Sequence, residues 1–323
     1  MDNIKGAEGS NNNNNELLAK DSRKHKVDYK WKKIIILIYI HLAGIYGLYL
    51  GLFHAKLWTI IWFFAFYNAA MLGTTAGCHR LWAHRSYKAK WPMKLILTIF
   101  QTAAFQGCIY SWVRDHRVHH KFTDTDADPY NARRGFFFSH IGWLVINKHP
   151  DVIKKSARID CTDMEQDPFV IFQRKWYTYL APFCCFLLPT LIPYWAWKET
   201  MSCAWHLTIC TLCLNLNMTF AVNSVAHIWG TKPYDKSISP VNNIGVSFVT
   251  LGEGWHNYHH VFPWDYKTAE LGNYVLDFAT VFIDFFAFLG LAYDLRIANI
   301  DIVKKRILRN NGTTLLDKIN DNE

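Results

Sequence analysis

Charged residues are scarce in this chain, and the stretches without them are apolar over long runs. Of the 323 residues only 19% are charged, against 51% that are hydrophobic and 16% that are aromatic. Soluble domains intersperse apolar residues with polar ones, whereas uninterrupted apolar runs indicate that lipid is the solvent. The composition therefore predicts an integral membrane protein rather than two water-soluble domains.

The sequence also lacks a nucleic-acid-binding motif, a disulfide framework and an apolar signal segment. The basic residues behind its formal charge of +9 are scattered beside apolar runs, as in loops kept in the cytosol, so we expect no nucleic-acid partner. Most of the eight cysteines lie within apolar runs, and the CxxC of Cys210 and Cys213 has no second pair, which disfavours zinc. Residues 1–27, with an asparagine tract, predict a disordered cytosolic tail.

Four apolar runs are long enough to cross a bilayer, which takes about 20 residues in a helix. They cover residues 34–53, 57–76, 177–197 and 202–222. The first two runs, and likewise the last two, are joined by only a few residues, so each pair predicts a helical hairpin. Lys and Arg gather outside these hairpins, and the positive-inside rule then places both termini and the long middle loop in the cytosol.

Two further apolar segments are interrupted by polar residues. Residues 93–110 include Gln101 and Gln106, and a crossing there would separate the flanking histidines by the membrane. Residues 278–295 include Asp284. We therefore expect interfacial or partly buried helices in both segments.

Nine of the fifteen histidines fall into four tight groups. The groups are HRLWAH (His79, His84), HRVHH (His116, His119, His120), NSVAH (His227, with Asn223 one turn earlier) and HNYHH (His256, His259, His260). On a helix, the three histidines of HxxHH share one face, but adjacent ones still diverge by about 100°. Such neighbours bind two metal ions more easily than they chelate one.

The histidines outnumber the ligands of any single metal site. A structural zinc takes four protein ligands and a catalytic zinc three, so nine imidazoles at the cytosolic end of the spans match two ions with open positions. Asn223 shares a helical face with His227 and is expected to hold a metal-bound water. Imidazole suits iron, copper, zinc and nickel alike; redox-active iron can activate oxygen, whereas zinc cannot.

The histidine groups and their surroundings resemble the membrane acyl-CoA desaturases of the stearoyl-CoA (delta-9) type, particularly insect members. The similar tracts run from about Asp28 to Leu295 and include TAGCHRLWAHRSYKA, DADPYNARRGFFFSHIGW, KPYDKSISP and GEGWHNYHH. With the four spans, the resemblance implies an all-α integral membrane fold of two hairpins under a cytosolic helical cap that holds a histidine-ligated dimetal site. A desaturase domain over residues 28–298 and a cytosolic tail at 299–323 are expected.

Proteins of this kind put a cis double bond into an acyl-CoA in the endoplasmic reticulum membrane. They use a non-haem diiron centre, molecular oxygen and two electrons from cytochrome b5 and its reductase. By this resemblance the nine histidines are the iron ligands, and Asn223 acts through a water. The chain contains no HPGG haem motif of a fused cytochrome b5 domain, so a separate donor is expected.

The resemblance also implies contacts to coenzyme A. The matching positions are Trp112, Arg114, Asp115 and Lys148. Arg114 has an alternative role as an ion-pair partner of Asp115. Gly107 and Asn147 stand where many members carry Asn and Arg, so those two roles are not carried over.

The second span offers a candidate wall for an acyl tunnel. Tyr67, Met71, Thr75 and His79 recur every four residues, which places Met71 about 12 Å below His79 in a regular helix. Ordinary packing against lipid or another span is the alternative. Met71 is the residue we expect to help close the tunnel.

Three other functions fit part of the pattern. A membrane fatty-acyl or alkane hydroxylase would use the same diiron site. A metal transporter would carry its polar residues within the spans, and a non-catalytic metal-binding protein need not retain all nine histidines. The tracts WVRDHRVHHKFTDTDADPYN and GEGWHNYHHVFP favour desaturation.

Overall fold

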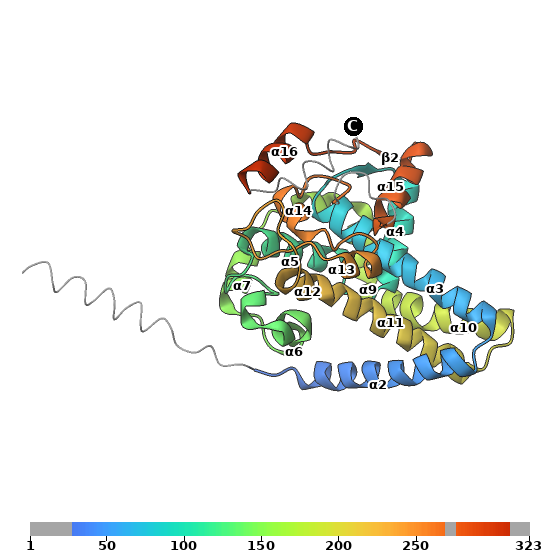
Figure 1. The fold of residues 1–323 in the computed structure, drawn as a ribbon. Coiled ribbons are helices and arrows are strands. Elements are labelled where there is room, and N and C mark those ends of the chain that lie inside the picture. The colour runs from blue at the N-terminus through green and yellow to red at the C-terminus, as the bar shows by residue number, and fades with distance from the viewer. Residues whose placement is uncertain (1–27, 269–275, 311–323) are drawn as a thin grey trace, which may run out of the picture.

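The computed structural model describes residues 28–268 and 276–310, and this part of the chain is mostly helical (Figure 1). Its strands form one two-stranded antiparallel sheet, in which β1 (Lys88–Ala89) pairs with β2 (Ala292–Tyr293). The sheet joins the start of the middle segment to the C-terminal part of the chain.

The tails predicted from the sequence are described only in part. The segment 1–27 lies outside the described residues, as does 311–323. Helix α16 (Ile300–Arg309) belongs to the expected C-terminal tail and buries Val303 and Ile307 against the same cluster as Tyr258.

Four helical stretches are long and apolar enough to cross a membrane, which confirms the predicted number of spans. Their bounds are Trp31–Phe53, Leu57–Ala83, Pro168–Ala196 and Met201–Ile228. They comprise α2 (Trp31–Phe53); α3 (Leu57–Leu72) with η1 (Gly73–Ala83); α9 (Pro168–Pro182), η4 (Phe183–Leu187) and α10 (Leu188–Ala196); and α11 (Met201–Asn223) with α12 (Val225–Ile228). The chain is a multi-pass membrane protein.

The second and third spans reach furthest beyond the apolar runs, for local reasons. The second continues as the π-helix η1 through the first histidine group. The third begins at Pro168, where the Asp167 side chain accepts hydrogen bonds from Phe169 N and Val170 N. A capping carboxylate followed by proline at the first helical position favours a helix start there, before the apolar run begins.

The two hairpins are joined by close packing and by a buried carboxylate. Helix α2 lies along α11, and a β-carbon at Gly47 would be 2.0 Å from the backbone oxygen of His206, so this approach requires glycine. At the opposite end of the spans from the histidines, Glu199 accepts hydrogen bonds from Lys56 N at 2.9 Å and Thr59 Oγ1 at 2.6 Å. Glu199 thereby ties the second hairpin to the start of α3.

The apolar segment 93–110 divides into parts of two helices. Helix α4 (Trp91–Ala103) buries one face against η1 and exposes another, whereas α5 (Ile109–Phe122) carries the HRVHH group. Between them Phe105 and Gly107 have positive φ angles of 55° and 91°, which ends the first helix before the expected boundary. Neither helix is a candidate span, as the sequence predicts.

Helix α15 (Phe278–Phe288) is the second predicted short apolar helix. Its Asp284 accepts a hydrogen bond from the Tyr266 hydroxyl at 2.8 Å, so the carboxylate that disfavours a span is paired within the cap.

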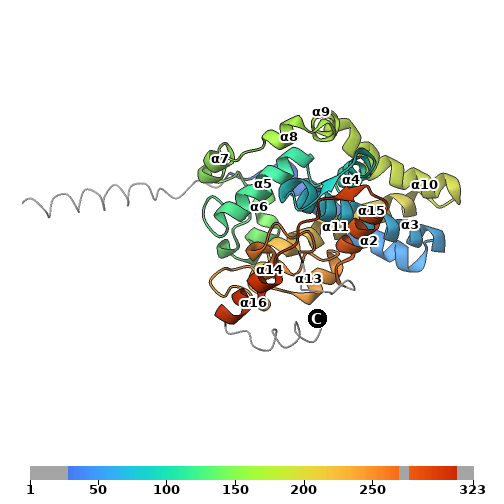
Figure 2. The same cartoon turned by 90° about the horizontal axis from the view of Figure 1, so that it is seen from above.

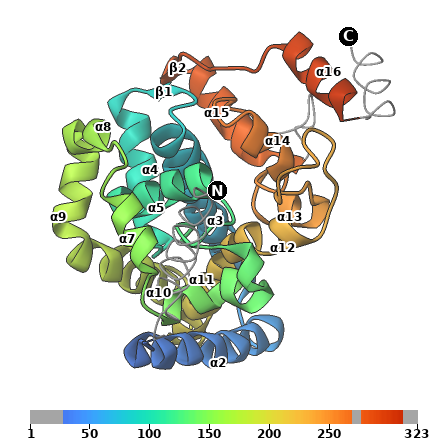
Figure 3. The same ribbon diagram turned by 90° about the vertical axis from the view of Figure 1, so that its left-hand side faces the viewer.

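The cap brings the histidine-bearing elements together. Figures 2 and 3 show α4 and α5 between α8 (Thr162–Gln166) and α9 on one side and α14 (His256–Val261) on the other. The remaining elements are η2 (Ala132–Arg134), η3 (Phe138–Gly142), α6 (Trp143–Val145), α7 (Pro150–Ser156) and α13 (Ile244–Val249). Tyr29, just before α2, forms a bridge with Ile146 after α6, so α2 starts at the cap.

Candidate metal centre and cavity

Each histidine group is held by a different element, either the end of a span or a helix of the cap. The first lies on η1 and at its end, the second on α5, the third on α12 and the fourth on α14. Gly73 lets η1 approach α4, because a β-carbon there would lie 2.2 Å from Gln101 N. The wide π turns of η1 also mean that the regular helical spacing assumed for the second span ends at Leu72.

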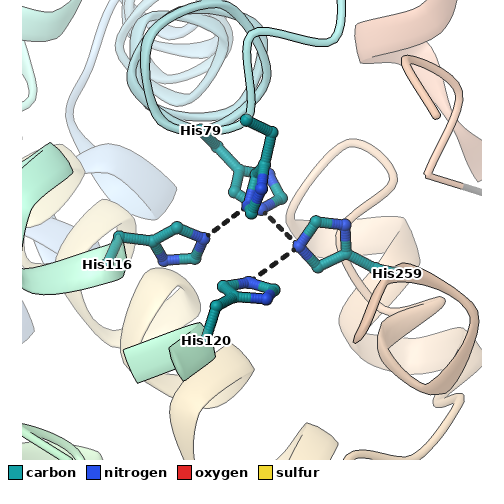
Figure 4. A group of neighbouring side chains, drawn as sticks. His79, His116, His120 and His259 are labelled. Carbon is teal, nitrogen blue, oxygen red and sulfur yellow. Dashed lines mark hydrogen bonds between the residues drawn. The ribbon is translucent and has the colours of Figure 1, made fainter. Parts of the chain in front are cut away.

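Five of the histidines form one cluster, in which the ligand nitrogens all lie within 4.8 Å of one another. Its members are His79, His84, His116, His120 and His259. Three Nε2–Nε2 distances connect the rings: 2.9 Å for His79–His259, 2.9 Å for His84–His116 and 3.0 Å for His120–His259. Figure 4 shows rings of this cluster directed toward one another.

The other four histidines form a second cluster of the same kind, comprising His119, His227, His256 and His260. His256 Nε2 lies 3.0 Å from His227 Nε2 and 3.1 Å from His260 Nε2. Adjacent residues are divided between the clusters: His119 is in one and His120 in the other. This division follows from the divergence of neighbouring side chains on α5 and α14.

The two clusters fit metal ions chemically. Imidazole nitrogens bound cis to one ion at about 2.1 Å lie about 3 Å apart, which matches the Nε2–Nε2 distances. Burial, and then the neighbouring imidazoles, lower the pKa of His116, His120 and His259 well below its ordinary value, which keeps these rings neutral. His119 Nε2 is buried in the second cluster without a hydrogen-bond partner. A neutral ring with a free lone pair is the form that binds a metal.

Three histidines contact an orienting group through their other ring nitrogen. His79 Nδ1 lies 2.7 Å from Glu253 Oε2, His119 Nδ1 lies 2.9 Å from Asp128 Oδ1, and His227 Nδ1 lies 3.0 Å from Ser239 Oγ. Such partners fix the tautomer and the ring orientation of metal ligands.

The sequence reasoning missed Asp128, Glu253 and Ser239. Asp128 and Glu253 belong to the DADPYN and GEGWHNYHH tracts, so a carboxylate close in sequence to a histidine group is the signal that could have identified them. Burial raises the pKa of Asp128, but the adjacent His119 and hydrogen bonds to the carboxylate outweigh burial and bring that pKa below its ordinary value.

An elongated cavity of about 510 Å³ adjoins both clusters. Its wall includes His79 and His116 of the first cluster, His256 of the second, and also Asn223 and Glu253. Asn223 is the last residue of α11, at the same level as the clusters.

Two of the three predicted tunnel residues line this cavity. Met71, which is 1% exposed, and Thr75 are part of its wall. Tyr67 is not, because its hydroxyl points elsewhere and donates a hydrogen bond to Val249 O at 2.6 Å.

A polar bridge crosses the cavity wall between α5 and α11. Gln106 Nε2 donates to Asn215 Oδ1 at 3.1 Å and to Thr219 Oγ1 at 2.9 Å, and Trp112 Nε1 donates to Gln106 Oε1 at 3.2 Å. The bridge fixes Trp112, which is stacked on His116 with ring centroids 4.9 Å apart. It therefore sets the shape of the cavity next to the first cluster.

All four positions matched to coenzyme A contacts line the cavity: Trp112, Arg114, Asp115 and Lys148. Asp115 accepts a hydrogen bond from Lys148 Nζ. By contrast, Arg114 Nη2 is 3.7 Å from Asp115 Oδ1, and the buried Nε of Arg114 has no hydrogen-bond partner. Arg114 is thus not committed to Asp115 alone.

The cavity has a further cationic side chain that the sequence reasoning missed. Lys33 of α2 lines it, although Asn147 does not. Burial, followed by the charges of Lys33 and Lys148, lowers the pKa of nearby Lys30. Lys33 and Lys148 therefore lie close enough to Lys30 for their charges to act on it.

Comparisons with known proteins agree with this arrangement. The family model described as Fatty acid desaturase matches residues 56–272. The chain is 54% identical to the Acyl-CoA Delta-9 desaturase of Acheta domesticus, over 91% of this chain and 83% of the relative. It is 51% identical to the Acyl-CoA Delta(11) desaturase of Spodoptera littoralis, over 93% and 89% of the two chains, and 47% identical to the Stearoyl-CoA desaturase 5 of Bos taurus, over 89% and 86%. This chain, with its paired histidine clusters beside a long cavity, belongs to the fatty acid desaturase family.

Proposed function

We propose that this protein is an oxygen-dependent acyl-CoA desaturase that introduces a cis double bond into a saturated acyl chain. Two hydrogen atoms leave adjacent methylenes and molecular oxygen is reduced to two waters, while a donor supplies the two further electrons and solvent supplies two protons. The supporting observation is an apolar cavity that reaches both histidine clusters and has Arg114, Lys148 and Lys33 in its wall.

The nine clustered histidines would hold two iron ions, with Asn223 contributing through a water. Bound iron would supply the activation of oxygen that removes hydrogen from an unactivated methylene. The carboxylates of Glu253 and Asp128, 2.7 and 2.9 Å from Nδ1 of His79 and His119, would hold a proton on Nδ1, so that each ring presents Nε2 to its cluster.

Selection of one methylene must come from positioning, since an alkyl chain offers no polar group near the reacting carbons. The cationic side chains would hold the phosphates of coenzyme A at one end of the cavity. The bridge from Trp112 through Gln106 to Thr219 would then fix the path of the chain past His116.

The double-bond position does not follow overall identity. Relatives that are 54%, 52% and 51% identical to this chain are named as Δ9, Δ12 and Δ11 desaturases, respectively. We therefore infer that particular residues of the cavity, and not overall similarity, decide the double-bond position in this chain.

Cytochrome b5 and its reductase are the proposed electron donors, with the basic face of the cap as their docking surface. We further propose the endoplasmic reticulum membrane as the location. The even number of spans places both termini on one face of the membrane, and the Lys and Arg outside the hairpins favour the cytosol for that face and for the cap. Tags at residues 10 and 320 should both be digested by protease in intact microsomes.

Expression in desaturase-deficient yeast tests the proposed reaction directly. We expect growth without added unsaturated fatty acid and a cis-monounsaturated product whose double bond can be located by mass spectrometry. A hydroxylated product would favour a hydroxylase instead, and an unchanged lipid profile at normal expression would contradict the proposed activity. The names of the relatives favour desaturation over hydroxylation or metal binding alone.

Replacing Lys33 with glutamine should raise the KM for acyl-CoA about two- to fivefold, the range for one partly exposed ion pair. The increase should shrink as salt is added, because salt screens exposed charges. Steady-state assays in microsomes measure it, with Lys32→Gln as the matched control, because Lys32 is exposed and does not line the cavity. Equal KM values for the two variants would exclude Lys33 from head-group binding.

A further inference from the structure

Arg80, next to the first cluster histidine, is completely buried between two carboxylates. Its Nε lies 3.0 Å from Glu253 Oε1 and its Nη2 lies 2.9 Å from Asp277 Oδ1. Nη1 donates to Tyr266 O at 2.9 Å and to Thr280 Oγ1 at 2.8 Å. A buried guanidinium is tolerated only when its donors are satisfied, so this site is built for Arg80.

The carboxylate on one side of Arg80 reaches the metal-binding cluster. Glu253 uses Oε1 for Arg80 and places Oε2 2.7 Å from His79 Nδ1. His79 Nε2 in turn faces His259 Nε2 at 2.9 Å. The contacts form a continuous chain from Asp277, at the start of α15, through Arg80 and Glu253 to the five-histidine cluster.

The backbone leaves room for this chain of contacts. Gly252 has φ of +125°, and a β-carbon there would lie 2.2 Å from Asp277 Oδ1. Any other residue at 252 would displace the Asp277 carboxylate. Asp277 itself accepts hydrogen bonds from Thr280, including one from Thr280 N at 3.1 Å, which fixes it at the start of α15.

The four-histidine cluster is supported differently. Asp128, which contacts His119, accepts hydrogen bonds from Asp124 N and Tyr130 N, each at 2.9 Å. Within the described residues no Lys or Arg forms an ion pair with Asp128. Among the described residues, a carboxylate that joins a histidine to a buried guanidinium is therefore found at the five-histidine cluster and not at the four-histidine cluster.

We propose that Arg80 is a positioning residue that, held by Asp277 and Thr280, acts through Glu253 on His79 and sets the metal affinity of the five-histidine cluster alone. This inference rests on the metal centre of the proposed function, but not on the reaction. Removing the distant Asp277 charge loosens Arg80, which weakens the hold of Glu253 on His79. The four-histidine cluster is unaffected because Asp128 is anchored by backbone amides.

Titration of the metal-free, full-length protein in detergent with Co²⁺ tests the proposal without any assay of activity. Glu253→Gln should weaken one of the two binding events by about 10- to 100-fold, the usual effect of losing an orienting partner of a metal ligand. Asp277→Asn should weaken the same event less, by about 3- to 10-fold, because Asp277 is two contacts further from the histidine than Glu253 is. Asp128→Asn, the matched control, should weaken the other event.

A spectroscopic readout separates positioning from folding. In ⁵⁷Fe-loaded protein, Glu253→Gln and Asp277→Asn should alter the same Mössbauer subspectrum, and the double variant should resemble Glu253→Gln alone because the residues act in series. If Asp277→Asn fails to fold, Thr280→Val probes the same link. Lowered melting temperature with both binding events and both subspectra unchanged would overturn the proposal. Absence of desaturation by the metal-loaded wild-type protein, with the expected metal effects in the variants, would instead contradict the proposed function and leave this proposal standing.

Discussion

Replacing His120 with alanine is expected to abolish desaturation and to reduce bound iron toward one ion per chain. His120 Nε2 lies 3.0 Å from His259 Nε2 in the five-histidine cluster, and its ring is stacked at 4.1 Å on His260 of the other cluster. Loss of this ring removes a ligand of one ion and opens space beside the second cluster. Alanine cannot bind metal, so no partial activity should remain.

Iron content and product formation should be measured on the same purified sample. His54→Ala is the matched control, since His54 is an exposed histidine in the loop after α2 and contacts neither cluster. The control should retain two irons and full turnover. Wild-type turnover in the His120 variant would refute its assignment as an iron ligand.

Replacing Met71 with alanine is expected to shift the preference toward longer acyl-CoA. Met71 is buried in the cavity wall, and its sulfur lies 4.0 Å from Thr219 Oγ1 of the polar bridge. A shorter side chain lengthens or widens the cavity. Each additional buried methylene contributes roughly 0.8 kcal/mol, or about fourfold, so two carbons should change the ratio by up to about 15-fold.

Competition between sixteen-carbon and eighteen-carbon acyl-CoA in microsomes measures this ratio, with iron content as the control for folding. Leu72→Ala is the matched variant, because Leu72 is also buried on the same helix but does not line the cavity. It should lower stability without changing the ratio. An unchanged ratio in the Met71 variant at normal iron loading would place the chain-length determinant elsewhere, with α11 the next element to test.

The membrane character and the family follow from short-range features of the sequence. A span requires only about 20 consecutive apolar residues, which can be read directly from the sequence. The structure confirms the predicted number of spans. The resemblance to the desaturases, which was carried by short sequence tracts, is confirmed by relatives that are about 50% identical to this chain over most of its length. The helix boundaries were less predictable. The third span begins earlier than expected because Asp167 caps the helix at Pro168, and the second continues further because η1 extends it to Ala83.

The sequence by itself determined that nine histidines gather in four groups and that adjacent ones diverge, because helical periodicity fixes the directions of neighbouring side chains. Only the tertiary structure divided them into clusters of five and four, excluded Tyr67 from the cavity and brought Asp128, Glu253 and Arg80 behind the histidines. The contacts of Arg80 join residues up to 200 positions apart, as Arg80 and Thr280 are. Periodicity sets where a side chain points, but the packing of η1, α5, α12, α14 and α15 against one another decides what it meets.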